Sequence, residues 1–168
     1  MQIVFRLDAS EKIGIGHFSR CKNLASYLSK RGAKIHFIVR NLNKNLSNYI
    51  KKKKFKISYL KKNSKFEKIL NLSEDKLWPN KLQIIDAFDT NNIIAKKKVD
   101  WLIVDHYGLN AAWENKLKKK VKNIMVIGDH LNRKHNCDLF LFQNYNKKKI
   151  NLEKQLPKTS KILLGPKF

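Results

Sequence analysis

The sequence predicts a single α/β domain built on an open parallel sheet. Short apolar segments alternate with helical patterns along the chain, which is the arrangement that right-handed strand–helix–strand crossovers produce. The 168 residues are enough for one such domain with a sizeable core. The chain shows neither an internal repeat nor a linker. We therefore expect one continuous domain over residues 1–168.

The first elements follow from periodicity. We expect strands at 2–7, 33–40 and 55–60, a helix from 17 to about 31, and a polar helix between the second and third strands. The apolar residues of the first helix recur at helical spacing, and Gly32 ends the run. They are Phe18, Cys21, Leu24, Ala25 and Leu28. Leu24 and Leu28 should face the sheet, with Lys22 and Lys30 in solvent.

The later elements continue the alternation after a weakly patterned stretch from 61 to about 81. Helical patterns cover 82–98 and 111–122, and the second of these places Trp113, Leu117 and Val121 on one face. Strands are expected at 99–107 and 123–130, with short strands at 137–144 and 161–168. A strand order of 3-2-1-4-5 makes the fold Rossmann-like and places the first, fourth and fifth strands side by side.

The net charge of +24 raises the question of a polyanionic partner. Only five of the 37 basic residues are arginines, the type that specific phosphate and base recognition favours. The lysines fall in separate runs, at 51–54, 96–98, 118–120 and 147–149, and asparagine is also abundant. We interpret the charge as a solvated surface under a compositional bias, with no specific nucleic-acid partner. The charge would still attract an anionic small molecule.

The chain reads as a cytoplasmic protein without a membrane partner. It has no apolar run of membrane-spanning length, and its N-terminus lacks the pattern of a signal peptide. Cys21 and Cys137 lie far apart and form no CxxC motif, so they are expected to be reduced thiols.

Three polar clusters each follow a predicted strand. They are Asp8 with Gly14, Gly16 and His17; Asp105, His106, Tyr107 and Gly108; and Asp129, His130, Asn132, Arg133 and His135. Loops at the carboxyl ends of neighbouring parallel strands form one crevice near the topological switch point. We therefore expect these clusters to converge on one site.

The glycine loop before the first helix is not a standard cofactor loop. A dinucleotide fingerprint would need glycine where Ser19 stands, and the second strand ends in Arg40 rather than an acidic ribose partner. The loop also lacks the Gly-Lys-Ser/Thr ending of a phosphate-binding P-loop. Its glycines still allow a ligand close to the backbone, and the helix N-terminus favours an anion. We expect no cofactor.

His17 is the candidate catalytic residue. We expect it in the first helical turn at the mouth of the crevice, where the positive end of the helix dipole disfavours imidazolium. A neutral imidazole there suits a general base. The alternative is a histidine that only caps the turn. The Asp-His pairs at 105–106 and 129–130 have side chains suited to a divalent ion, but they lack the spacing of a strong metal motif, so we expect no metal.

Three segments carry a resemblance to a known family. "FRLDASEKIGIGHFSRCKNLA", "IVDHYGLNAAWE" and "NRKHNCDLFLFQN" resemble, in the same order, the UDP-2,4-diacetamido-2,4,6-trideoxy-β-L-altropyranose hydrolases of pseudaminic acid biosynthesis. "GPKF" at the end resembles the family's next segment. The resemblance covers essentially the whole chain.

The resemblance implies a fold like that of inverting glycosyltransferases with two facing Rossmann domains, of which residues 1–168 form the N-terminal half and the second, nucleotide-binding half is absent. Water would attack the anomeric carbon of a UDP-sugar, with inversion and release of UDP. His17 matches the family's base. The matching substrate contacts are Gly14, Ile15, Gly16, Arg20, Asp105, His106 and Tyr107. Asp8 and Asp129 complete the predicted substrate-binding set.

One departure and two alternatives accompany this interpretation. The family often has two adjacent aspartates after the fifth strand, whereas this chain has Gly128 and then Asp129. A glycosyltransferase of the same architecture would use His17 to activate an acceptor hydroxyl instead of water. A non-catalytic basic binding module would rest on the +24 charge alone.

Overall fold

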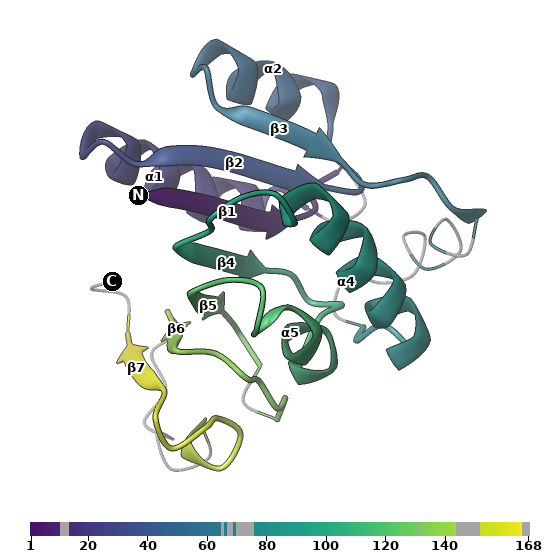
Figure 1. Cartoon of the computed structure of the whole chain (residues 1–168), viewed down its shortest axis with the longest axis vertical. Helices are drawn as coiled ribbons and strands as arrows, with labels where there is room; N and C mark the ends of the chain where they lie inside the picture. The colour runs from purple at the N-terminus through teal and green to yellow at the C-terminus, as the bar shows by residue number, and fades with distance from the viewer. Residues whose placement is uncertain are drawn as a thin grey trace.

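The fold is an open, all-parallel sheet with helices on both faces, as the sequence predicts (Figure 1). The computed structural model describes the chain except residues 11–13, 65, 67–68, 70–75, 131, 144–151 and 166–168. Within the described residues the sheet has seven strands in the order β3-β2-β1-β4-β5-β6-β7. The predicted order of the first five strands is therefore confirmed. Most of the "GPKF" segment lies outside the described residues.

The strands fall where the apolar segments predict them; β1 has the predicted bounds and the other strands are shorter. They are β1 (Gln2–Leu7), β2 (Lys34–Val39), β3 (Lys56–Tyr59), β4 (Trp101–Asp105), β5 (Asn123–Ile127), β6 (Leu139–Phe142) and β7 (Lys161–Leu164). The buried strands β1, β2 and β4 are nearly continuous apolar runs because helices cover both faces of a parallel sheet. The chain builds β1 to β3 in one direction and then crosses back to β4, so the topological switch point lies between β1 and β4.

The helices are α1 (Gly16–Lys30), α2 (Lys44–Lys52), α4 (Asn80–Ile94) and α5 (Ala111–Leu117). Helix α5 is shorter than the predicted 111–122, because residues 118–122 form a turn. Figure 1 shows α4 and α5 on one face of the sheet and α1 on the other. Among the described residues, none of the helices combines the length and apolar character needed to cross a bilayer.

The two faces of the sheet have separate cores. Side chains of α1 and α2 pack on one face, where Phe18, Cys21 and Ala25 meet Phe5 and Phe37. Residues of α4 and α5 pack on the other face, around Trp113 and Leu102. The alternation of strand side chains between the faces assigns neighbouring residues to different cores. The same alternation decides on which face of the sheet the polar residues just beyond the strands lie.

The predicted inner face of the first helix is only partly right. Phe18, Cys21 and Ala25 are fully buried, whereas Leu24 and Leu28 are half-buried at the margin of the core. Lys22 is not fully solvated either, because its Nζ lies 5.4 Å from the centre of the Tyr49 ring. The face of α1 that contacts the sheet is therefore centred nearer Cys21 than the sequence pattern suggests.

Leu24→Ala is expected to lower the free energy of unfolding by about 1–2 kcal/mol, because only part of the side chain is removed from water in the fold. A fully buried leucine would cost more. Urea unfolding monitored by circular dichroism measures the difference. A loss below about 0.5 kcal/mol would mean that Leu24 lies on the outer face of α1.

Candidate active site at the switch point

The candidate site lies at the carboxyl edge of the sheet, where the loops after β1, β4 and β5 meet. The register pairs Leu7 with Asp105 and Val104 with Val126, so the three strands end almost level. The three clusters meet at this edge of the sheet, as expected. They do not form the single site that we expected, because their side chains divide into two polar networks on opposite faces of the sheet.

His17 and Asp105 form a close pair on the α1 face. His17 is the second residue of α1, and its Nδ1 lies 2.5 Å from Oδ1 of Asp105, the last residue of β4. A carboxylate oxygen only accepts, so Nδ1 donates and the basic lone pair of the imidazole is on Nε2. Hydrogen bonding by Asp105 therefore selects the tautomer that a general base needs.

The expectation that His17 lies open at the crevice mouth is wrong. The residue is only 4 % exposed. The Asp105 bond draws the ring inward, and the Tyr107 ring packs against it nearly edge-on, with centroids 4.4 Å apart and planes at 71°. The imidazole is consequently held in one orientation by a hydrogen bond and an aromatic contact.

Arg20 connects this pair to the loop after β5. It lies one helical turn beyond His17, and its Nε and Nη2 donate to Oδ2 and Oδ1 of Asp105 at 3.0 and 2.8 Å. Its Nη1 donates to Oδ2 of Asp129 at 2.8 Å. Arg20 thus bridges two carboxylates that belong to different strand ends.

Tyr107, in the loop after β4, completes the group of residues around His17. Its hydroxyl donates to Oδ2 of Asp129 at 3.0 Å. Burial and the neighbouring Asp129 carboxylate raise the pKa of Tyr107 to about 12. The phenol therefore remains protonated near neutral pH and serves as a donor.

The glycine loop has one position that requires glycine. Gly14 adopts φ 78°, in the left-handed region, and forms an antiparallel bridge with Ser10. Gly16, in contrast, begins α1 with open space where a Cβ would stand. Of these two glycines, only Gly14 therefore has a backbone conformation that strains other residues. Ile15, the N-cap residue, is 61 % exposed.

Gly14→Ala is expected to lower the free energy of unfolding by about 1–2 kcal/mol, because an L side chain is strained at positive φ. Gly16→Ala, two residues along, is the matched control. It should not lower the free energy of unfolding, since the added Cβ meets no atom within 4 Å. Urea titration of both variants measures the difference. Equal stabilities would contradict the assigned backbone conformation.

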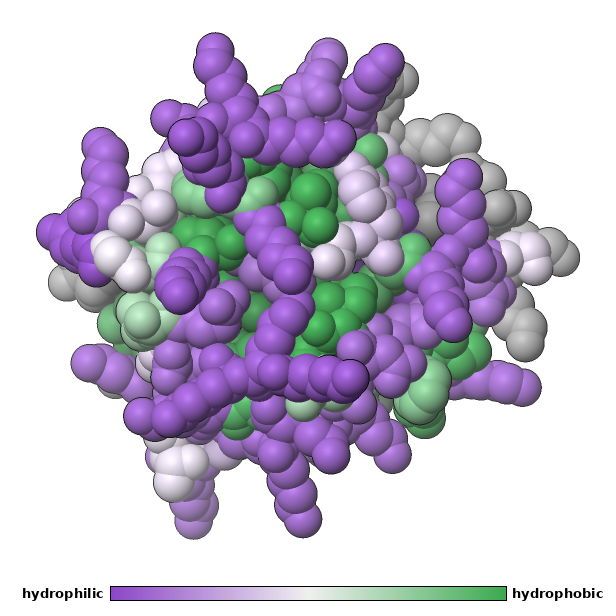
Figure 2. Space-filling model, turned by 45° about the horizontal axis from the view of Figure 1, so that its top comes forward, coloured by the Kyte–Doolittle hydropathy of each residue, from purple (hydrophilic) through white to green (hydrophobic). Residues whose placement is uncertain are grey.

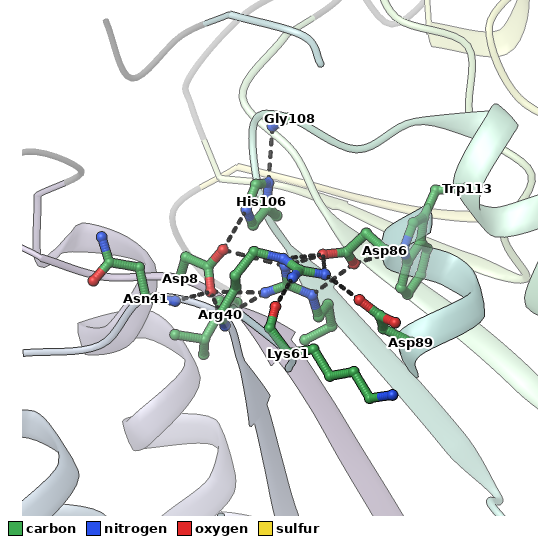
Figure 3. A network of polar contacts seen from close by, with 11 residues as sticks. Asp8, Arg40, Asn41, Lys61, Asp86, Asp89, His106, Gly108 and Trp113 are labelled. Carbon is green, nitrogen blue, oxygen red and sulfur yellow. Dashed lines mark hydrogen bonds and ion pairs between the residues drawn. The ribbon is translucent and has the colours of Figure 1, made fainter. Parts of the chain in front are cut away.

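Asp8 and His106 belong to the second network, on the α4 and α5 face (Figure 3). Asp8 is fully buried and accepts from Nη1 and Nη2 of Arg6 at 2.9 and 3.2 Å. It also accepts the backbone N–H groups of Arg40 and Asn41. All these partners are protein groups. A substrate contact for Asp8 stays a prediction.

His106 uses both of its ring nitrogens inside the protein. Nδ1 accepts the backbone N–H of Gly108 at 2.9 Å, so Nε2 carries the proton and donates to Oδ2 of Asp8 at 3.0 Å. Burial lowers the pKa of His106, although Asp8 opposes the effect. Because its one basic lone pair, on Nδ1, already accepts from Gly108, His106 cannot replace His17 as a base.

Sequence reasoning missed the centre of this second network. Arg6 is fully buried in β1 and also donates from Nε and Nη2 to both oxygens of Asp86 in α4, at 3.0 and 2.8 Å. Arg40 reaches Asp86 and Asp89, and Trp113 donates Nε1–H to Asp86. The available signal was an arginine inside an apolar strand, because a buried charge requires partners.

The third cluster surrounds a small hollow beside Tyr107. The hollow has a volume of about 10 Å³, room for about one water molecule, and Asp129, His130, Arg133 and His135 contribute to its walls. His135 Nδ1 pairs with the buried Glu114 at 2.6 Å. Within the described residues no group of three or more His, Cys, Asp or Glu is arranged to hold a metal ion.

The Phe140 ring packs close against Gly128. A Cβ added there would lie 2.6 Å from the Phe140 ring of β6. In this chain a larger residue at 128 would require the ring to move. Only Asp129 is left to present a carboxylate, and Arg20 and Tyr107 both bind it.

Comparison with models of known protein families and with curated proteins finds no match for the chain.

Proposed function

We propose that this domain carries the catalytic base of a UDP-sugar hydrolase. The observation that supports the proposal is the His17–Asp105 pair at the switch point. His17 Nε2 accepts a proton from a water molecule as its oxygen bonds to the anomeric carbon. The bond from that carbon to the β-phosphate oxygen breaks, and its electron pair leaves with UDP. Attack opposite to the leaving group inverts the anomeric configuration.

The pair suits this chemistry because Asp105 does two things. It keeps the proton of neutral His17 on Nδ1, and its charge stabilises the imidazolium that forms as water is deprotonated. A positioned general base of this kind contributes roughly 10²–10⁴-fold to the rate. UDP is a good leaving group, so base catalysis without a metal is sufficient for the reaction we propose.

The start of α1 suits an anionic substrate. Its first turn contains no acidic residue, its N-cap Ile15 provides no side-chain hydrogen bond, and Gly16 is exposed. Free backbone N–H groups at a helix N-terminus favour negative charge, and His17 belongs to the same turn. We propose that the diphosphate approaches this turn while the sugar lies beside His17.

We favour a small anionic ligand over a nucleic acid, because only five of the 37 basic residues are arginines and the lysines fall in separate runs along the chain. Figure 2 shows hydrophilic side chains projecting all round the visible face, with apolar residues between them, and no single stripe. Basic residues that bind a nucleic acid usually gather on one face. Cys21 and Cys137 are both buried free thiols, which supports our proposal of a cytoplasmic location.

The test uses the full-length protein that contains these residues, because the resemblance implies a second nucleotide-binding half. The protein is incubated with the UDP-2,4-diacetamido sugar in ¹⁸O-labelled water. We expect release of UDP, with ¹⁸O in the free sugar and none in UDP, and an inverted anomer in early proton NMR spectra. Turnover should survive EDTA.

Three outcomes would overturn the proposal. Label in UDP would indicate attack at phosphorus. Transfer of the sugar only to an added acceptor would indicate a glycosyltransferase. Salt-sensitive nucleic-acid binding without sugar turnover would indicate a binding module. If EDTA abolishes hydrolysis and a divalent ion restores it, the metal-free part of the mechanism fails.

A further inference from the structure

Arg20 occupies the centre of a closed ring of contacts around the proposed base. The contacts lead from His17 to Asp105, from Asp105 to Arg20, and then through Asp129 to Tyr107. The aromatic ring of Tyr107 packs against His17 and closes the set. We propose that Arg20 is a positioning residue, which fixes the Asp105 carboxylate and through it the tautomer and orientation of His17. The inference rests on the proposed function for its catalytic consequence.

The geometry of Arg20 on Asp105 is that of a planar fork. Nε and Nη2 donate to the two different oxygens of one carboxylate, at 3.0 and 2.8 Å, which prevents the carboxylate from rotating. Oδ1 therefore keeps one lone pair directed at His17 Nδ1. Asp105 is 1 % exposed as a side chain, so water does not provide a substitute for the fork.

Arg20 has a second support besides Asp105, although its side chain is 24 % exposed. Asp129 supplies it by accepting from Nη1 at 2.8 Å. The same oxygen of Asp129 accepts the Tyr107 hydroxyl, which fixes the ring that packs on His17. Arg20 thus acts on His17 through Asp105 and through Asp129 with Tyr107, and its Nη2 also lies 3.2 Å from His17 Nδ1, close enough to restrict the imidazole directly.

The charges of the ring favour a proton on His17 during the reaction. The carboxylates of Asp105 and Asp129 carry two negative charges and Arg20 carries one positive charge, which leaves one negative charge while His17 is neutral. Proton transfer from water to Nε2 adds a positive charge on His17, and the net charge of these four residues becomes zero. Arg20 therefore balances one carboxylate and leaves the other available to stabilise the imidazolium.

The experiment measures the His17 tautomer directly by ¹⁵N NMR, at about pH 8, where an ordinary histidine is neutral. His17→Asn identifies the resonances. The wild-type protein should show a protonated Nδ1 and an unprotonated Nε2. Arg20→Met should give a mixture of the two tautomers, and Arg20→Lys, which keeps the charge but loses the fork, should give an intermediate mixture. Arg31→Met, at the exposed end of α1, is the control and should not change the spectrum.

Turnover provides the second measurement. Arg20→Met should lower kcat by about 10–100-fold with little change in KM, and Arg20→Lys should restore part of the loss. Tyr107→Phe removes only the hydroxyl and should have a smaller effect in the same direction. If Arg20→Met proves unfolded by circular dichroism, Asp129→Asn tests the same route, because it removes the charged support of Arg20.

The two proposals fail in different ways. A wild-type tautomer in folded Arg20→Met and Asp129→Asn overturns the positioning role, whether or not the protein hydrolyses UDP-sugars. A rise in KM with unchanged kcat also overturns it, since that result assigns Arg20 to substrate binding. A changed tautomer in a protein that hydrolyses nothing supports the positioning role and overturns the proposed function.

Discussion

His17→Asn in the full-length protein is expected to lower kcat by about 10²–10⁴-fold with little change in KM. The proton transfer to Nε2 occurs only in the transition state, so its loss affects kcat rather than substrate binding. Asparagine is the informative replacement because its side-chain amide can still donate to Asp105, as Nδ1 of His17 does. Steady-state kinetics of UDP release measure the effect.

His17→Leu is the matched comparison for the structural part of the effect. It removes the donor to Asp105 Oδ1 in a buried setting, so it should also lower the free energy of unfolding by about 1–3 kcal/mol. Near-normal kcat in a folded His17→Asn protein would exclude the general-base role. Because both nitrogens of His106 are occupied by Gly108 and Asp8, His106 would not be the substitute.

Arg6→Met is expected to lower the free energy of unfolding by about 3–5 kcal/mol at pH 7. Arg6 is fully buried between Asp8 and Asp86, and removing one partner of a buried ion pair leaves an uncompensated charge. Asp86 keeps Arg40 as a charged partner, whereas Asp8 loses the Arg6 charge and keeps only His106 and two backbone N–H donors among the contacts described for it. Urea unfolding of the variant against the wild type measures the loss.

The difference in free energy of unfolding between the wild type and Arg6→Met should shrink as the pH falls. Burial would raise the pKa of Asp8, but Arg6 and His106 outweigh it and hold that pKa well below its ordinary range, and Arg6 likewise lowers the pKa of Asp86. The stability from these depressed values is present above about pH 4, the unfolded pKa, and is lost as the pH falls through the folded pKa. Without Arg6, burial dominates and raises the pKa of Asp8, so the variant gains stability on acidification.

The control for this prediction is Arg31→Met. Arg31 is exposed and contacts only the Tyr27 ring among the side-chain interactions described for it, at 3.7 Å. Replacing Arg31 should lower the free energy of unfolding by less than about 1 kcal/mol at every pH. A similarly small loss for Arg6→Met, or a difference that grows in acid, would contradict the buried-network interpretation.

The local sequence was sufficient to predict the framework of this domain. Apolar segments such as 2–7 and 101–105, separated by helical patterns, indicate a parallel sheet because only buried strands are apolar on both faces. The rule that ligands gather at strand carboxyl ends then placed His17, Asp105 and Asp129 at one edge. Element ends were less predictable: α5 stops at Leu117, although the apolar spacing continues to Val121.

Only the tertiary structure decided how the polar residues are divided. Asp105 and His106 are adjacent in sequence, yet Asp105 pairs with His17 and Arg20 on the α1 face, whereas His106 pairs with Asp8 on the face covered by α4 and α5. Successive side chains at a strand end point to opposite faces, and each charged group then takes the partner that its own face offers. Arg6 and Asp86 lie 80 residues apart in the chain and meet only because α4 crosses over β1. Sequence alone therefore determined which residues reach the site, and the packing of helices on the two faces determined which of them act together.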